Sequence, residues 1–107
     1  MNLSAAQAQH FKDTLVLAAE KVCPLYGVDI ETCIEASAAA TWFGKFAIHN
    51  NYFDLAGSGD RGYNVYVVVE RTTDIQNGGC KVLTIKKARF SSAEASVRAY
   101  CEGQGRR

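Results

Sequence analysis

The sequence predicts an α+β fold in which a mainly helical lobe carries a small β-hairpin. Apolar residues recur at helical spacing near both ends of the chain, and between them one run alternates as a half-buried strand does. The Asn77-Gly78 pair after that run is the strongest short hairpin signal in the chain. With 107 residues, 48% of them hydrophobic, the chain is expected to form a single packed domain over residues 1–107.

The N-terminal segment predicts a helix over residues 4–22. Ser4 and Gln7 have the spacing of a capping box, and an apolar stripe follows at helical intervals. Pro24 and Gly27 are expected to end this helix. The stripe consists of Phe11, Leu15, Ala18 and Val22.

Asp29 is placed to cap a second helix over residues 30–41. Residues 43–53 are expected to form a short helix and a turn. Glycines at 57, 59 and 62 then predict a flexible loop, since no lysine and no strand–loop–helix context supports a phosphate site. The inner side of the second helix is predicted to consist of Cys33, Ile34, Ser37 and Ala38.

The hairpin is predicted to pair residues 63–70 with a return strand over residues 80–86. Ser91 and Glu94 have capping-box spacing and predict a last helix to about residue 102. The inward residues of this helix are expected to be Val97, Tyr100 and Cys101.

Charge and cysteine content exclude several classes of protein. A net charge of +1 argues against a general nucleic-acid binder. No apolar run approaches the roughly 20 residues of a membrane span, and no secretory signal is expected at the N-terminus.

The cysteines form no CxxC pair and have no histidine nearby, so no metal is expected. They are either four buried thiols or two disulfides, for which the favoured pairings are Cys23–Cys33 and Cys80–Cys101.

Four blocks of the sequence, in order, resemble the glucosaminidases of glycoside hydrolase family 73. They are GVDIETCIEASAAATWFGK (27–45), NNYF (50–53), TTDIQNG (72–78) and RFSSAEASVRAY (89–100). The resemblance implies a lysozyme-like fold, in which the helical lobe and the hairpin flank a glycan groove. It also implies hydrolysis of the β-1,4 bond after N-acetylglucosamine in peptidoglycan, without a cofactor.

The chain departs from the family pattern at three positions that matter here. Asp54 replaces a glycine, Lys87 replaces a phenylalanine, and Ala40 stands at the catalytic glutamate. Cleavage of a glycosidic bond needs an acid that protonates the leaving oxygen, and alanine cannot supply a proton. Three readings of Ala40 stay open: an engineered Glu→Ala change, a natural domain that binds without cutting, or transfer of the acid role to Glu35. Glu35 lies about 140° round the helix from position 40, which disfavours the third reading.

The resemblance implies further site residues on the hairpin. Asp74 stands where the family has a hairpin glutamate, and Glu70 and Thr72 share its face in a regular strand. Phe43 and Phe53 are expected to join the two lobes, and Asn51 to be a structural cap. The residues expected to contact substrate are Trp42, Tyr63, Tyr66, Thr72 and Tyr100.

The implied partner is the glycan strand of peptidoglycan, so the protein is expected to act in the periplasm or cell wall. One reading is an interbacterial toxin delivered by a type VI secretion system and met by a cognate immunity protein. Its rival is a domain of an autolysin, flagellar or phage protein. A muramidase or lytic transglycosylase would share the fold but cut at the other β-1,4 bond, and a non-catalytic module would bind glycan or protein without cleavage.

Overall fold

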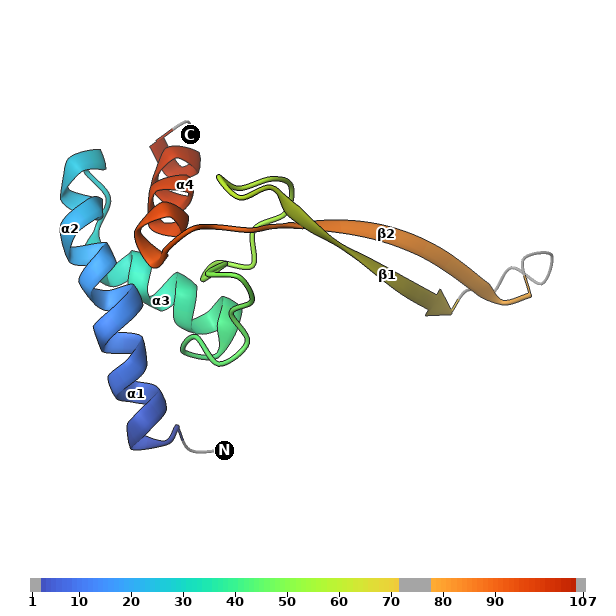
Figure 1. The fold of residues 1–107 in the computed structure, drawn as a ribbon, viewed down its shortest axis with the longest axis horizontal. Coiled ribbons are helices and arrows are strands. Elements are labelled where there is room, and N and C mark those ends of the chain that lie inside the picture. The colour runs from blue at the N-terminus through green and yellow to red at the C-terminus, as the bar shows by residue number, and fades with distance from the viewer. Residues whose placement is uncertain (1–2, 72–77, 106–107) are drawn as a thin grey trace.

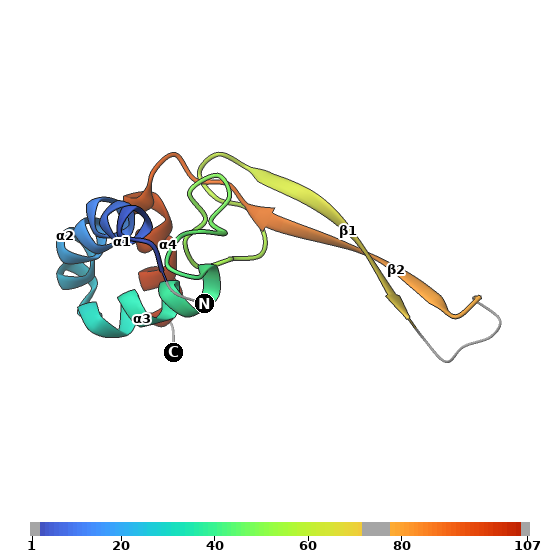
Figure 2. The same ribbon diagram turned by 90° about the horizontal axis from the view of Figure 1, so that it is seen from below.

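The computed structural model describes residues 3–71 and 78–105. Helices gather at one end of the molecule and a hairpin projects from them as a long arm, so the molecule measures 52 × 35 × 24 Å (Figures 1 and 2). This arrangement confirms the predicted α+β fold. In the described part of the chain, no helix is long and apolar enough to cross a membrane. The elements are α1 (Ala5–Phe11), η1 (Lys12–Val16), α2 (Leu17–Tyr26), α3 (Ile30–Thr41), β1 (Tyr63–Arg71), β2 (Cys80–Ala88) and α4 (Ala93–Gly105).

The N-terminal helical segment begins as predicted but ends later. Both capping-box hydrogen bonds between Ser4 and Gln7 are present. The helix passes through a π-helical turn, η1, which contains Thr14. The Thr14 hydroxyl donates to the carbonyl of His10 at 2.7 Å. Such side-chain bonds compete with the regular backbone pattern, and no sequence signal used above predicts the π turn.

The prediction that Pro24 ends this helix is wrong. Proline removes one backbone donor, but Pro24 lies in the last turn, where the helix can lose that bond and continue to Tyr26. The end is set by Gly27, whose φ of 67° is the left-handed conformation that glycine favours. The amide of Val28 then donates to the carbonyl of Cys23 at 3.1 Å, which closes the helix end.

The core lies between α2, α3 and α4. The Asp29 carboxylate caps α3 by accepting from the amide of Thr32 at 2.9 Å, as predicted. On the predicted inner side of α3, Cys33 and Ser37 are fully buried, while Ile34 and Ala38 are half-buried. The largest fully buried apolar side chains of the other helices are Leu15, Val22 and Val97.

The segment after α3 forms turns rather than the short helix that was predicted for residues 43–53. Its backbone is left-handed at Trp42, Phe43 and Gly44, with φ of 52°, 54° and 82°. Three consecutive left-handed residues cannot continue a right-handed helix.

The hairpin agrees with the predicted pattern and is slightly longer. Strands β1 and β2 pair antiparallel from Tyr63 opposite Ala88 to Arg71 opposite Cys80. Asn77, the first residue of the predicted turn, lies outside the described residues, and Gly78 and Gly79 both have positive φ.

The N-cap of α4 is Ser92, not Ser91 as predicted. The Ser92 hydroxyl accepts from the amide of Ala95 at 3.1 Å. The amide of Ser91 instead donates to Asp60 at 3.0 Å, and the side-chain and backbone hydrogen bonds from Ser91 lower the pKa of that carboxyl. Ser91 therefore joins the start of α4 to the loop before the hairpin. Val97 and Cys101 face the core as predicted.

All four cysteines are free thiols, so both predicted disulfides are wrong. Cys80 is exposed on the hairpin arm, whereas Cys101 is buried in α4 beside Cys23, with 3.9 Å between the sulfurs. Cys33 is buried in α3. Burial raises the pKa of the Cys33 thiol, and it raises the pKa of Cys101 to about 12. In the described residues, no group of three or more His, Cys, Asp or Glu side chains could hold a metal ion.

We predict that only one of these thiols reacts readily in the folded protein. Thiolate is the reactive form, and burial disfavours it at Cys33 and Cys101. Titration with a chromogenic disulfide reagent should give one fast equivalent in native buffer and four in denaturant. A Cys80→Ser variant should lose the fast equivalent, and a second fast thiol in the native protein would contradict the buried cluster.

Candidate functional site

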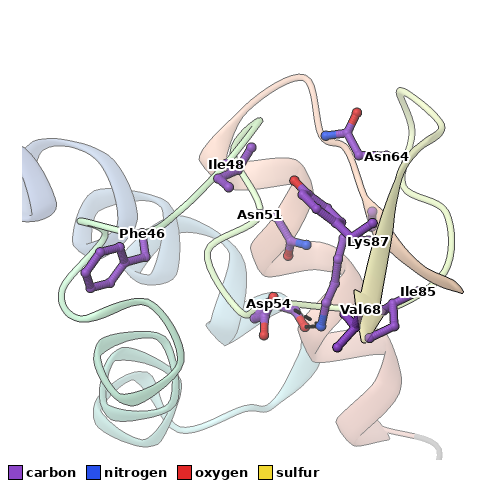
Figure 3. Close-up of a pocket in the computed structure, with 10 residues that line it drawn as sticks. Phe46, Ile48, Asn51, Asp54, Asn64, Val68, Ile85 and Lys87 are labelled. Carbon is purple, nitrogen blue, oxygen red and sulfur yellow. Dashed lines mark hydrogen bonds and ion pairs between the residues drawn. The ribbon is translucent and has the colours of Figure 1, made fainter. Parts of the chain in front are cut away.

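A cavity of about 330 Å³ lies between the hairpin and the segment of residues 42–57, which we call the bridging loop. Figure 3 shows loop residues such as Phe46 and Ile48 on one side and strand residues such as Val68 and Ile85 on the other. A mainly apolar cavity with a few polar side chains is the usual form of a ligand site. It is lined by Phe46, Ile48, Asn51, Asp54, Asn64, Tyr66, Val68, Ile85, Lys87 and Ala88.

The bridging loop is fixed to the end of α3. The Thr41 hydroxyl donates to the carbonyl of Ser37 at 2.8 Å and accepts from the amide of Gly44 at 2.9 Å. The carbonyl of Thr41 accepts from the amide of Phe46 at 2.9 Å, and the Ser37 hydroxyl donates to the carbonyl of Tyr52 at 2.6 Å. The position of the α3 C-terminus relative to the cavity is therefore set by direct hydrogen bonds.

The same loop is fixed to the hairpin at its other end. The amide of Gly57 donates to Lys86, and the amide of Ala88 donates to Leu55, each at 3.0 Å. Asn51 is buried, and its amide group both donates to and accepts from the backbone of Leu55, at 3.0 and 2.9 Å. Asn51 is thus the structural cap that the sequence predicts.

Alternation along β1 separates the two tyrosines that were expected to contact substrate. Tyr66 lies on the face of β1 that lines the cavity, with Asn64 and Val68. Tyr63 lies on the opposite face, where the Lys86 ammonium sits 4.7 Å from its ring centre. Of this pair, only Tyr66 lines the cavity.

Ala40 is exposed although it shares a side of α3 with a core residue. Residues seven apart on a helix are about 20° apart around the axis, so Ala40 lies on the same side as Cys33. Cys33 is fully buried, whereas Ala40 is exposed near the cavity end of α3. Ser37 and Thr41 remain buried on neighbouring sides of the last turns of α3, so Ala40 is an exposed position beside the core. Glu35 lies on the other side of α3 and is exposed there.

Trp42 is the C-cap of α3, two residues after Ala40. It is 36% exposed, and its ring meets Phe43 edge to face with 5.7 Å between centroids. Left-handed backbone at two consecutive large residues, Trp42 and Phe43, is strained and is maintained only where surrounding contacts fix it.

The hairpin carboxylates can be placed only in part. Glu70 is exposed and follows Val68 by two residues, so it continues the cavity face of β1 toward the tip of the arm, opposite Lys81. Thr72 and Asp74 lie outside the described residues.

Tyr100 does not line this cavity. Its ring stacks on Phe53 with centroids 4.3 Å apart, and it lines two smaller hollows between α4 and its neighbours. Phe53 is buried and so joins the bridging loop to α4, which supports its expected role between the lobes. A contact between Tyr100 and a sugar stays a prediction, and Tyr100 lies outside the cavity.

The contact between Asp54 and Lys87 is not predicted by the sequence. Both were noted only as departures from the family pattern, 33 residues apart. The structure pairs them in the cavity wall, where the bridging loop meets β2, with 3.2 Å between the Lys87 ammonium and the Asp54 carboxylate (Figure 3). Their opposite charges are the one sequence signal that could have linked them.

Solved structures share this fold. The catalytic domain of the autolysin Auto from Listeria monocytogenes matches with a TM-score of 0.71 and 17% identity over 95% of this chain. The truncated glycoside hydrolase domain of FlgJ from Salmonella typhimurium matches at 0.69 and 21% over 92%, and a peptidoglycan hydrolase mutant from Sphingomonas sp. A1 at 0.65 and 22% over 94%. The chain spans 58%, 74% and 68% of these three structures. No protein-family model and no curated protein sequence matches the chain.

These likenesses identify the class of fold. The chain shares the fold of these autolysin, glycoside hydrolase and peptidoglycan hydrolase domains, a lysozyme-like α+β fold as the four sequence blocks implied.

Proposed function

We propose that this chain is a peptidoglycan-directed glucosaminidase domain in which alanine occupies the position of the general acid. With alanine at position 40, the domain would bind glycan strands without cutting them. With glutamate at position 40, it would cleave the β-1,4 bond after N-acetylglucosamine. The observation that carries the proposal is Ala40 itself, which is exposed at the end of α3 in a fold shared with glycoside hydrolase domains.

Position 40 is exposed and lies two residues before an aromatic residue in the sequence. A carboxylic acid that must donate a proton benefits from an apolar setting, which raises its pKa. The next residues, Thr41 and Trp42, supply a hydrogen-bonded helix end and an indole ring. Glu70 and, by the sequence match, Asp74 are the candidates for the second carboxylate that stabilises the sugar cation or activates water.

Peptidoglycan as substrate implies action at the cell wall. A toxin role and a cognate immunity protein remain predictions from the sequence. They would be supported by a specific inhibitor protein that blocks the Ala40→Glu enzyme, and contradicted if the domain functions only in remodelling its own cell wall.

The test uses purified peptidoglycan and both forms of the chain. The parent chain, which has alanine at position 40, should co-sediment with sacculi and release no fragments. The Ala40→Glu form should release fragments with reducing N-acetylglucosamine ends, identified by mass spectrometry after borohydride reduction. Reducing N-acetylmuramic acid ends would indicate a muramidase, and 1,6-anhydro ends a lytic transglycosylase. Binding without cleavage by either form would leave a non-catalytic module, and absence of binding would end the proposal.

A further inference from the structure

The cavity wall contains an ion pair that a neutral sugar does not need. The Lys87 ammonium lies 3.2 Å from the Asp54 carboxylate and 3.4 Å from the Asp54 carbonyl oxygen. The Lys87 side chain is 29% exposed and that of Asp54 58% exposed, and both line the cavity with apolar side chains. Sugar hydroxyl and acetamido groups can hydrogen-bond to these side chains, but they carry no charge, so a ligand made only of sugar would not use the charges of the pair.

Backbone geometry indicates that the carboxylate at position 54 is an addition to the fold rather than a requirement of it. Asp54 has a φ of 50°, in the left-handed region where glycine is the least strained residue and aspartate is tolerated. Glycine, the residue of the family pattern, would satisfy this turn. The chain instead places a carboxylate here and a lysine opposite it.

We propose that Asp54 and Lys87 form a subsite for the zwitterionic diamino-acid end of a peptidoglycan stem peptide. Lys87 would bind its carboxylate and Asp54 its ammonium group. The subsite rests on the proposed function, because it takes peptidoglycan as the ligand and adds which part of it is recognised. A cavity of about 330 Å³ is at the small end of ligand sites and suits one amino-acid unit.

The internal ion pair would hold the two groups in place until the ligand exchanges with it. A partly exposed pair contributes little stability, so opening it costs little. A zwitterion replaces both halves of the pair at once and leaves neither charge unmatched. A simple anion would gain from Lys87 but would be repelled by Asp54, and a simple cation the reverse.

Calorimetry measures the binding of three probes to the parent chain, which has alanine at position 40 and should not cut them. The probes are a disaccharide tetrapeptide with a free diaminopimelate amine, the same molecule with that amine acetylated, and chitotetraose, which carries no peptide. Lys87→Met and Asp54→Asn should each weaken binding of the first probe by about tenfold or more, because each removes a charge-assisted hydrogen bond. The loss for chitotetraose should be smaller, so each change should lower the ratio of the affinity for the peptide probe to the affinity for chitotetraose.

Acetylation of the amine provides a second, independent readout. It should weaken binding to the parent chain but have little further effect on Asp54→Asn, since both changes remove the same contact. Asparagine also tolerates left-handed backbone, so Asp54→Asn should keep the melting temperature of the parent. Lys21→Met is the matched control, because Lys21 pairs with Glu94 at 3.5 Å on the helical lobe and does not line the cavity.

The outcomes separate the subsite from the proposed function. Equal affinity of parent and variants for the peptide probe, or binding of chitotetraose with no gain from the peptide, overturns the subsite and leaves glycan binding intact. Failure of the parent to bind any probe overturns both proposals.

Discussion

Replacing Ala40 with glutamate is expected to turn this chain from a glycan binder into a peptidoglycan hydrolase. General acid catalysis contributes about 10²–10⁴-fold to a reaction rate, so turbidity of a sacculus suspension should fall for Ala40→Glu and stay constant for the parent. The acid must be protonated to act, and cleavage should therefore decline as the pH rises through its pKa. Release of reducing ends measures the rate directly.

Two control variants make this result specific to position 40. Ala40→Gln has nearly the shape of the glutamate variant but no acidic proton, and it should remain inactive. Ala39→Glu places the same carboxyl on the neighbouring exposed position, about 100° round α3, and it should also be inactive. Activity in Ala39→Glu, or in the parent, would show that the acid has been placed at the wrong residue.

Gly59→Ala is expected to destabilise the fold strongly. A Cβ at Gly59 would lie 2.9 Å from both the carbonyl carbon of Arg89 and a ring carbon of Phe90, and closer still to the Arg89 oxygen. That oxygen accepts from the amide of Arg61, so the backbone there cannot shift without losing this bond. Overpacking against backbone should cost about 3 kcal/mol, which lowers the melting temperature by more than roughly 10 °C in a domain of this size.

The matched control is Gly103→Ala in α4, where a Cβ meets nothing within 4 Å. Alanine is the better helix former there, so stability should rise by about 0.5–1 kcal/mol. Urea unfolding of both variants followed by circular dichroism measures the two effects. Similar stability of Gly59→Ala and the parent would show that the turn before the hairpin does not pack on Arg89 as described.

Local chemistry determined much of the fold. Ser4 and Asp29 carry the capping side chains of their helices, and their capping follows from residues three positions away. The alternation in β1 and the hairpin have the same local origin. These features can be predicted because their partners are near in sequence or obey a fixed period.

Features that depend on distant partners could not be predicted in the same way. The capping-box pattern favours Ser91, and only the position of Asp60 decides that Ser91 bonds elsewhere while Ser92 caps the helix. The pairing of Cys80 with Cys101 looked reasonable along the chain, yet one lies on the arm and the other in the core.

The same distinction between local and distant partners applies to the candidate site. The resemblance of the sequence blocks to the family predicts that position 40 is the place of a missing acid, and it marks Asp54 and Lys87 as departures. Only the tertiary structure decided that Ala40 is exposed, that Tyr63 turns away from the cavity while Tyr66 lines it, and that Asp54 and Lys87 meet. The physical reason is that exposure and ion pairing depend on which elements pack together, and a residue's own neighbours along the chain do not determine that packing.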